Sequence, residues 1–259
     1  MFRLGDEMVV RLPSGPAYAS AIEREQRWLP HLAPRLPVSV PEPIAKGEPV
    51  ADYPWSWCIY SWIPGNTLHD SEGINLVALG RSVGEFLSAL QAVDATDGPT
   101  SGPRNFYRGG SLGVYAEQTA QAIDSLGDQL DVDSVQSVWR RSMESGWERK
   151  PLWVHGDISA GNLLVRDGEL CGVIDFGQMS VGDPACDLAI AWTVLSGESR
   201  EVFREAIPLD PETWARGRGW ALWKALIVAA EVVQSTAVES DRCWRTIREV
   251  VADYAACDA

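Results

Sequence analysis

Two short apolar runs joined by an Asp-Gly pair, with polar residues at fixed places around them, constrain the fold of this chain most strongly. The runs occupy residues 162–166 and 169–174. Asp-Gly between such runs predicts a tight β-hairpin, because glycine accepts the positive φ that a two-residue turn requires. The hairpin would place Asn162, at the start of one strand, close to Asp175, which follows the other strand.

The polar residues around this hairpin occur in an order that suits phosphate chemistry. His155 and Asp157 precede it in the segment VHGDISAGN, and Asp175 follows it in VIDFG. Phosphoryl transfer to a hydroxyl needs a carboxylate that orients the hydroxyl and accepts its proton, and oxygen ligands for Mg²⁺. Asp157 fits the base, and Asn162 and Asp175 fit the ligands. Each residue alone would also fit a turn cap or a strand end, but the set in this order favours the site.

The segments HGDISAGN, VIDFG and GDPACDLA resemble the aminoglycoside phosphotransferase family, relatives of choline kinase and, more distantly, of protein kinases. The segments RLGDEMVVRLP, PWSWCIYSWIPGNTL and RGRGWALWKAL extend the resemblance over the whole chain. It implies an α+β, protein-kinase-like fold with a small antiparallel β-sheet lobe in residues 1–62 and a mostly helical lobe in residues 63–259. It further implies ATP or GTP as donor, Mg²⁺ as cofactor, and a small-molecule hydroxyl as acceptor.

The resemblance also assigns a nucleotide-binding role to residues of the first lobe. Arg11 matches the cation that holds the donor phosphates, and its planar fork suits bidentate phosphate contact. We expect Glu25 to be its partner on the following helix, with Glu23 as the alternative. The adenine or guanine base is expected to pair with backbone groups between Ser61 and Ile63.

Two further polar residues are expected to hold the catalytic loop. His155, which we group with the catalytic residue Asp157, is interpreted as a residue that hydrogen-bonds within the catalytic and metal loops and is itself no acid or base. Asp187, in GDPACDLA, is expected to brace the catalytic loop from a helix start, with a direct substrate contact as the alternative. Ser159 stands where protein kinases usually carry Lys, which fits the small-molecule branch of the family.

The start of the chain departs from the family pattern. Family members carry a strand and a phosphate-covering loop before the strand that is matched here by residues 2–4. We therefore expect the first strand and this loop to be missing, through a late start codon, a truncation or degeneration of the protein. The presence of Asp157, Asn162 and Asp175 favours a shortened form of an intact enzyme. Such a chain would bind nucleotide less tightly and expose the phosphates to water.

Composition narrows the class of protein. A net charge of −14 argues against nucleic-acid binding, which requires clustered Lys and Arg. No apolar run approaches the roughly 20 residues that span a bilayer, and no signal segment opens the chain. The 5 cysteines are irregularly spaced without a CxxC pair, which predicts free thiols and a cytoplasmic location.

The distribution of charge bears on the acceptor. Residues 1–62 hold 6 Lys and Arg and 7 Asp and Glu, so −13 of the net charge lies in the remaining chain. An acidic lobe would attract a small cationic hydroxylated acceptor such as an aminoglycoside, although acidity also serves solubility alone. The alternatives are a kinase of a macrolide, peptide antibiotic, amino alcohol or sugar, and a weak or inactive nucleotide-binding homologue.

The remaining pattern predicts the secondary structure. Strands are expected at 2–4 and 8–12, followed by a helix over 19–29 that ends at Pro30 and by strands at 44–47 and 57–62. Trp214, Trp220 and Trp223 are interpreted as helix packing, with an aromatic wall for a sugar as the alternative. The second lobe is expected to contain helices over 76–90, 114–126, 133–145, 184–196, 200–206, 211–235 and 239–256.

Overall fold

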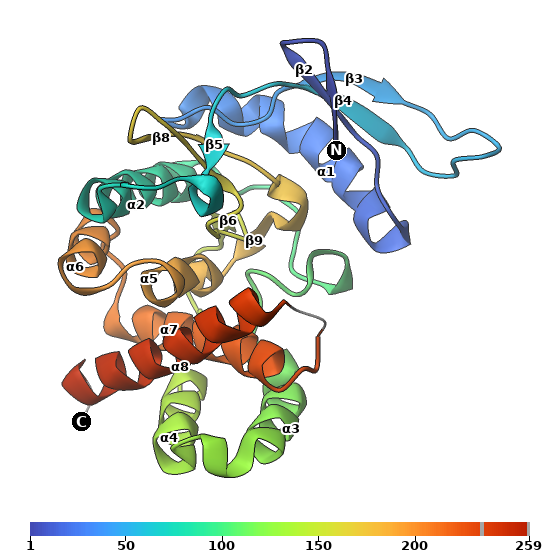
Figure 1. Ribbon diagram of the computed structural model, residues 1–259. Coiled ribbons are helices and arrows are strands. Elements are labelled where there is room, and N and C mark those ends of the chain that lie inside the picture. Colours follow the sequence, from blue (N-terminus) through green and yellow to red (C-terminus); the bar gives the residue numbers. More distant parts are fainter. Residues whose placement is uncertain (234–235, 258–259) are drawn as a thin grey trace.

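The computed structural model describes residues 1–233 and 236–257, which form two lobes (Figure 1). The first lobe is a four-stranded antiparallel sheet, in the order β1-β2-β4-β3, with helix α1 packed against it. The second lobe is mostly helical, so the predicted α+β fold is confirmed. The elements of the first lobe are β1 (Phe2–Leu4), β2 (Met8–Arg11), α1 (Pro16–Leu32), the 3₁₀ helix η1 (Ala33–Arg35), β3 (Pro43–Gly47) and β4 (Trp57–Ser61).

Both strand pairs predicted for the first lobe are present. β1 and β2 form an antiparallel hairpin in which Phe2 pairs with Val10. Gly5 turns the chain with a φ of +62°, a left-handed conformation that glycine adopts without a Cβ clash. β2 also pairs with β4, so that Arg11 lies opposite Cys58 near the middle of the sheet.

Helix α1 is longer than predicted. It continues past Pro30 to Leu32, although proline removes one backbone hydrogen bond from the last turn. Leu29 and Leu32 are fully buried on either side of Pro30. Burial of these two side chains offsets the lost hydrogen bond, because most helix stability in proteins comes from packing of the apolar face.

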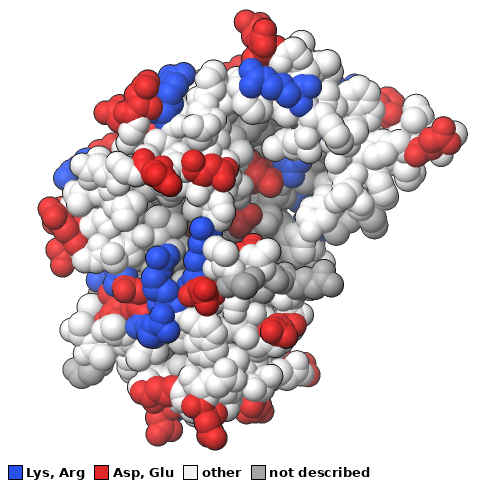
Figure 2. Space-filling model, viewed as in Figure 1, with Lys and Arg blue, Asp and Glu red and all other residues white. Residues whose placement is uncertain are grey.

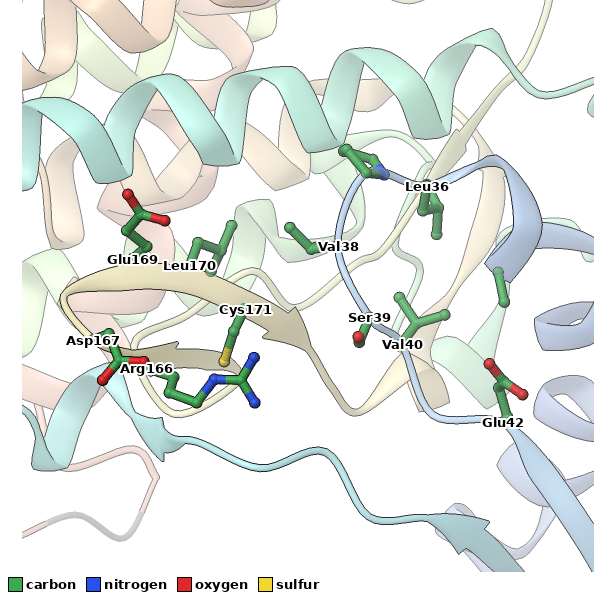
Figure 3. Close-up of a pocket in the computed structure, with 12 residues that line it drawn as sticks. Leu36, Val38, Ser39, Val40, Glu42, Arg166, Asp167, Glu169, Leu170 and Cys171 are labelled. Carbon is green, nitrogen blue, oxygen red and sulfur yellow. The ribbon is translucent and has the colours of Figure 1, made fainter.

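A short bridge joins the linker after α1 to the second lobe. The Ser39 N–H donates to the Cys171 carbonyl at 3.3 Å, and the Val173 N–H donates to the Ser39 carbonyl at 3.0 Å. Beside this bridge lies a pocket of about 560 Å³ that both lobes line (Figure 3). None of its lining residues belongs to the loops at 155–162 or 175–177, so this pocket is distinct from the candidate active site.

The second lobe surrounds three small strand pairings with helices. β7 pairs with β5 and β8, and β6 pairs with β9. Its strands are β5 (Asn66–Thr67), β6 (Leu152–Val154), β7 (Leu163–Arg166), β8 (Glu169–Val173) and β9 (Ser180–Gly182). Its helices are η2 (Leu68–Asp70), α2 (Leu76–Ala92), η3 (Pro103–Asn105), η4 (Leu112–Tyr115), α3 (Ala116–Leu126), η5 (Gly127–Gln129), α4 (Val132–Met143), η6 (Phe176–Gln178), η7 (Pro184–Ala189), α5 (Ile190–Thr193), α6 (Gly197–Ala206), α7 (Pro211–Ala229) and α8 (Ala237–Cys257).

The predicted Asp-Gly hairpin is confirmed. Asp167 and Gly168 take φ values of 55° and 84° between β7 and β8, as a two-residue turn with left-handed residues requires. The hairpin connects the catalytic loop before β7 to the loop after β8. The Ile174 N–H donates to the Asn162 carbonyl at 2.9 Å, which brings the two loops together as the sequence predicted.

Two predicted helices of the second lobe differ from the structure. The segment 184–196 forms the 3₁₀ helix η7 and the four-residue helix α5, because the N–H groups of Val194 and Leu195 both bind the Ile190 carbonyl and close the turn. Helix α7 ends at Ala229, and Glu231 takes a positive φ of 55°, which a continuing helix excludes. Residues 234–235 of the predicted helix 211–235 lie outside the described residues.

Helix α7 forms the centre of the second lobe and contacts η7, α3, α4 and α8. Trp214, Trp220 and Trp223 are all buried, as the packing interpretation predicts. Within residues 1–233 and 236–257, no helix combines the length and the apolar character that crossing a membrane requires.

Candidate active site

The loop that carries Asp157 is fixed by a buried carboxylate. Strand β6 ends at Val154, and the N–H groups of His155 and Gly156 then donate to the two oxygens of Asp187 at 2.7 Å each. Asp187 is 1% exposed. Burial raises the pKa of its carboxyl, and His155 and the two N–H groups oppose that rise. Asp187 therefore braces the catalytic loop, and its oxygens face the backbone of that loop.

His155 joins the catalytic loop to the loop that carries Asp175. Its Nδ1 accepts from the Asp157 N–H at 3.1 Å, which leaves the ring proton on Nε2, and Nε2 lies 3.1 Å from the Ile174 carbonyl. The Phe176 ring packs edge-on against it at 4.5 Å between centroids. His155 is fully buried with both nitrogens engaged, so it positions the two loops.

Asn162 is held by Asp157. Its Nδ2 donates to the Asp157 carbonyl at 2.8 Å and to Asp157 Oδ2 at 3.1 Å. Since the amide nitrogen faces Asp157, the amide oxygen is the atom left to meet a cation.

Asp175 lies at the start of the loop after β8 and takes a left-handed conformation, with φ of 62°. Its side chain is 41% exposed, and its Oδ1 accepts from Arg11 Nη2 at 2.8 Å. A Cβ on Gly177 would come within 2.9 Å of Arg11 Nη2 and 3.1 Å of Asp175 Oδ1. Glycine at 177 therefore allows this contact between the two lobes.

Arg11 bridges Asp175 and a buried glutamate of α1. Its Nη1 lies 2.5 Å from Glu25 Oε1, and Tyr60 donates its hydroxyl proton to Glu25 Oε2. Burial lowers the pKa of Arg11, but Glu25 and Asp175 raise it by more, so the guanidinium stays charged. Burial and the Glu25 carboxylate raise the pKa of Tyr60, which keeps its hydroxyl a donor. Glu23, the alternative partner, is exposed on the other side of the helix.

The oxygen donors fit a magnesium ion whose other ligands come from a nucleotide and water. No group of three His, Cys, Asp or Glu within the described residues forms a metal site by itself. Asn162 and Asp175 offer one amide oxygen and one half-exposed carboxylate. Mg²⁺ is commonly held by one or two protein ligands together with phosphate and water, so this pair suffices.

The segment between the lobes has one unpaired donor at the position predicted for the nucleotide base. The Ser61 N–H donates to the Glu42 carbonyl at 3.0 Å, and the Trp62 N–H donates to the Glu7 carbonyl at 2.7 Å. The Ile63 N–H has no backbone partner among the described residues. The Ser61 N–H, by contrast, is engaged within the sheet.

The structure adds residues that the sequence did not single out. Tyr60 lies on the buried face of β4 and donates to Glu25. Because a buried tyrosine hydroxyl generally finds a hydrogen-bond partner, a tyrosine in this strand could have been predicted to bind one. Arg108 packs beside the catalytic loop, and Lys224 lies on the adjacent helix α7. Arg108 stands in no recognisable motif, and Lys224 lies in the family-like segment RGRGWALWKAL without being singled out there, so only the fold relates the two residues to the catalytic loop.

The fold and the site define a class of protein. A small antiparallel sheet with an Arg–Glu pair packs on a helical lobe that carries a catalytic loop, a hairpin and an aspartate loop, which is the arrangement of kinase-like phosphotransferases. The sequence model described as "Phosphotransferase enzyme family" matches residues 1–220. The chain therefore belongs to the phosphotransferase enzyme family.

Known proteins agree with this assignment. An aminoglycoside 3'-phosphotransferase of Escherichia coli is 26% identical over 155 residues. That match covers 54% of this chain and 53% of the relative, so the chain spans about half the length of the curated relatives it matches. The solved GDP complex of aminoglycoside 2'-phosphotransferase-IIIa has a TM-score of 0.65 at 16% identity, over 95% of this chain and 87% of the other. Macrolide 2'-phosphotransferase from Brachybacterium faecium has a TM-score of 0.60 at 21% identity, over 93% and 84%.

Proposed function

We propose that this chain transfers the γ-phosphate of ATP or GTP to a hydroxyl group of a small molecule in the presence of Mg²⁺. The observation that carries the proposal is the chain of contacts from Glu25 through Arg11 to Asp175, beside Asn162 held on Asp157. These contacts support the assignment of Arg11 as the phosphate-binding cation, Asn162 and Asp175 as metal ligands and Asp157 as the base, around a hollow between the lobes. Figure 2 shows this hollow with acidic and basic atoms in its walls.

Each side chain has a defined task in the proposed reaction. Asp157 orients the acceptor hydroxyl and accepts its proton, while Asn162 holds the Asp157 carboxylate in place. Arg11 contacts the donor phosphates from the first lobe, positioned by Glu25. A bound Mg²⁺, held by Asn162 and Asp175, would neutralise charge on the phosphates. Direct in-line transfer requires no covalent phosphoenzyme.

The relatives and the segment between the lobes support the choice of phosphate donor and of the acceptors to test. The Ile63 N–H and carbonyl groups near Ser61 are proposed to pair with the nucleotide base, and related structures hold GDP or ATP. An aminoglycoside is the first acceptor to test, because the curated relatives carry that name. Macrolides come next, because a macrolide phosphotransferase shares the fold.

We place the reaction in the cytoplasm. All five cysteines are free thiols in the structure, and Cys58 and Cys186 are buried as small apolar groups. Free thiols of this kind fit the reducing conditions of that compartment. ATP and GTP, the proposed donors, are also supplied there.

The proposal is tested by nucleotide binding and acceptor-dependent turnover. Calorimetry with ATP and GTP, with and without Mg²⁺, measures donor binding, and release of ADP or GDP is followed with aminoglycosides, macrolides, amino alcohols and sugars. We expect Mg-dependent nucleotide binding and turnover that requires an acceptor. Failure to bind either nucleotide would contradict the proposal. Binding without turnover of any acceptor would instead favour a nucleotide-binding protein without kinase activity.

A further inference from the structure

A cationic side chain packs directly against the catalytic loop on the side of the second lobe. A Cβ on Gly156, the residue before Asp157, would lie 3.0 Å from both Cβ and Cγ of Arg108. Arg108 Nε donates to Gln178 Oε1 at 3.1 Å, which ties it to the end of the metal loop as well. Arg108 therefore stands beside the base without belonging to either motif.

The guanidinium of Arg108 lies over aromatic rings and forms no ion pair within the described residues, although its charge opposes the rise that burial causes in the pKa of Asp187. Its Cζ lies 4.9 Å from the Trp220 ring centroid and 5.3 Å from that of Trp223. Tyr115 stacks on Trp223 at 3.8 Å, and Trp223 Nε1 donates to Gln118 Oε1 at 2.9 Å, so the rings are fixed. Among the described residues no carboxylate lies within ion-pair distance of Arg108. Its terminal N–H groups donate to no atom of the described residues and can therefore donate to a ligand.

A second cation lies next to this cluster. Lys224 follows Trp223 in α7 and is the exposed residue in the otherwise buried stretch 213–228. It forms no ion pair or hydrogen bond with the part of the chain that the structure describes. Partial burial and Arg108 lower the pKa of Lys224, while Asp157 opposes that change. Lys224 lies one helical turn after Trp220 on α7, and the Arg108 guanidinium lies over the Trp220 ring, so the two cations face the same region of this helix.

The segment that presents Arg108 has an unusual backbone. Phe106 and Tyr107 take consecutive left-handed conformations, with φ of 52° and 53°, which bulky side chains rarely adopt. Hydrogen bonds hold this turn, since Tyr115 donates to the Phe106 carbonyl at 2.8 Å and the Gly110 N–H to the Tyr107 carbonyl at 3.0 Å. Such conformations persist where surrounding structure fixes them, and they gather at functional sites.

We propose that Arg108 and Lys224 bind an anionic group of the acceptor, such as a carboxylate, and so select a hydroxylated anion or zwitterion over a polycation. This inference rests on the proposed kinase function and names its substrate class. Neither cation forms an ion pair within the described residues, although the charges of Asp157 and Glu239 also act on Lys224, so an anionic acceptor group can contact both cations without displacing a carboxylate. The donor phosphates are assigned to Arg11 in the first lobe, whereas both of these cations belong to the second.

The inferred acceptor differs from the cationic one that the charge of residues 63–259 predicted. The net charge of −13 on residues 63–259 produces a long-range field, which guides the first encounter between the protein and an acceptor. Affinity in the site depends on groups within a few ångströms, since exposed charges further apart than about 8–10 Å are screened by salt. The hollow in Figure 2 carries basic as well as acidic atoms and is not uniformly acidic.

The test compares matched acceptors in the wild-type chain and in single variants. Release of ADP or GDP is measured with gluconate, homoserine, glucose and kanamycin, which represent an anion, a zwitterion, a neutral sugar and a polycation. Calorimetric titration of the same compounds into protein saturated with Mg²⁺ and ADP measures binding without turnover. Lys224→Gln and Arg108→Gln remove one charge each, Lys224→Arg retains it, and Arg140→Gln on the exposed end of α4 is the matched control.

We expect gluconate or homoserine to bind and to be phosphorylated in preference to kanamycin. Lys224→Gln should raise the acceptor KM about tenfold to a hundredfold, as loss of one charge-assisted contact does, with Lys224→Arg and Arg140→Gln close to wild type. Nucleotide Kd should stay unchanged in every variant. Equal or better use of kanamycin, or binding of neither carboxylate, would overturn the inference and leave the kinase function intact. Weaker nucleotide binding in Lys224→Gln would also overturn it and assign the cation to the donor phosphates.

Discussion

Replacing Asp187 by asparagine tests how the catalytic loop is held. The carboxylate accepts from the N–H groups of His155 and Gly156 at 2.7 Å each, and it is almost completely buried. Asparagine keeps one acceptor oxygen and turns an amide N–H₂ toward the second backbone donor. One charge-assisted hydrogen bond is lost, and such a bond usually contributes about 1.5–3 kcal/mol to the free energy of unfolding. The variant also no longer buries a charged carboxylate, which offsets a part of this loss.

We therefore expect Asp187→Asn to lower the free energy of unfolding by roughly 2 kcal/mol, and Asp187→Ala, which leaves both donors unpaired, by roughly 4 kcal/mol. For a chain of this size, 2 kcal/mol corresponds to a Tm lower by about 4–8 °C. Urea and thermal unfolding followed by tryptophan fluorescence measure both values. Asp124→Asn, an exposed acid on α3, is the control for the charge change.

The same variant should affect catalysis. Displacement of the loop moves Asp157 relative to the acceptor, and a shift of about 1 Å in a positioned group lowers the rate by roughly a hundredfold. We expect kcat to fall at temperatures where Asp187→Asn remains folded, with nucleotide Kd unchanged. If Asp187→Asn instead had the Tm and the kcat of Asp124→Asn, Asp187 would not brace the loop.

Three further substitutions test the first lobe and the metal ligands. Arg11→Lys should weaken Mg-nucleotide binding about tenfold in calorimetry, because an ammonium cannot contact Glu25 and Asp175 with a planar fork; an unchanged Kd would contradict this. Asp175→Ala should make nucleotide affinity independent of Mg²⁺, and retained Mg²⁺ dependence would exclude it as a ligand. Tyr60→Phe removes a buried hydrogen-bond donor to Glu25 and should lower the free energy of unfolding by about 2 kcal/mol, as measured by urea-induced unfolding. An unchanged free energy of unfolding would show that water replaces the Tyr60 hydroxyl.

Local chemistry explains why much of the fold could be predicted. The β7–β8 hairpin follows from Asp167-Gly168, whose left-handed conformations depend on neighbours in sequence alone. Hairpin β1–β2 follows in the same way from Gly5. Helix α2 begins after Asn75, whose side chain accepts from two N–H groups, and its apolar side chains recur at helical spacing.

Features that depend on tertiary contacts could not be predicted. Helix α1 passes Pro30 because Leu29 and Leu32 are buried against other elements, and no local rule reports that burial. The approach of Arg108 to Gly156 joins segments about fifty residues apart, and the segment FYRGG carries no motif. The choice between Glu25 and Glu23 depended on helix phase, which the structure resolves by burying Glu25 against Arg11.

A single-turnover assay tests the central claim that Asp157 is the base of a phosphotransferase. Protein in excess over a γ-labelled nucleotide is mixed with Mg²⁺ and acceptor, and the labelled phosphoryl group is followed onto the acceptor in the wild type and in Asp157→Asn. We expect transfer by the wild type, a rate about 10²–10⁴-fold lower in the variant, and the same nucleotide Kd in both. Equal transfer rates in the two proteins would contradict the assignment of Asp157 as the base.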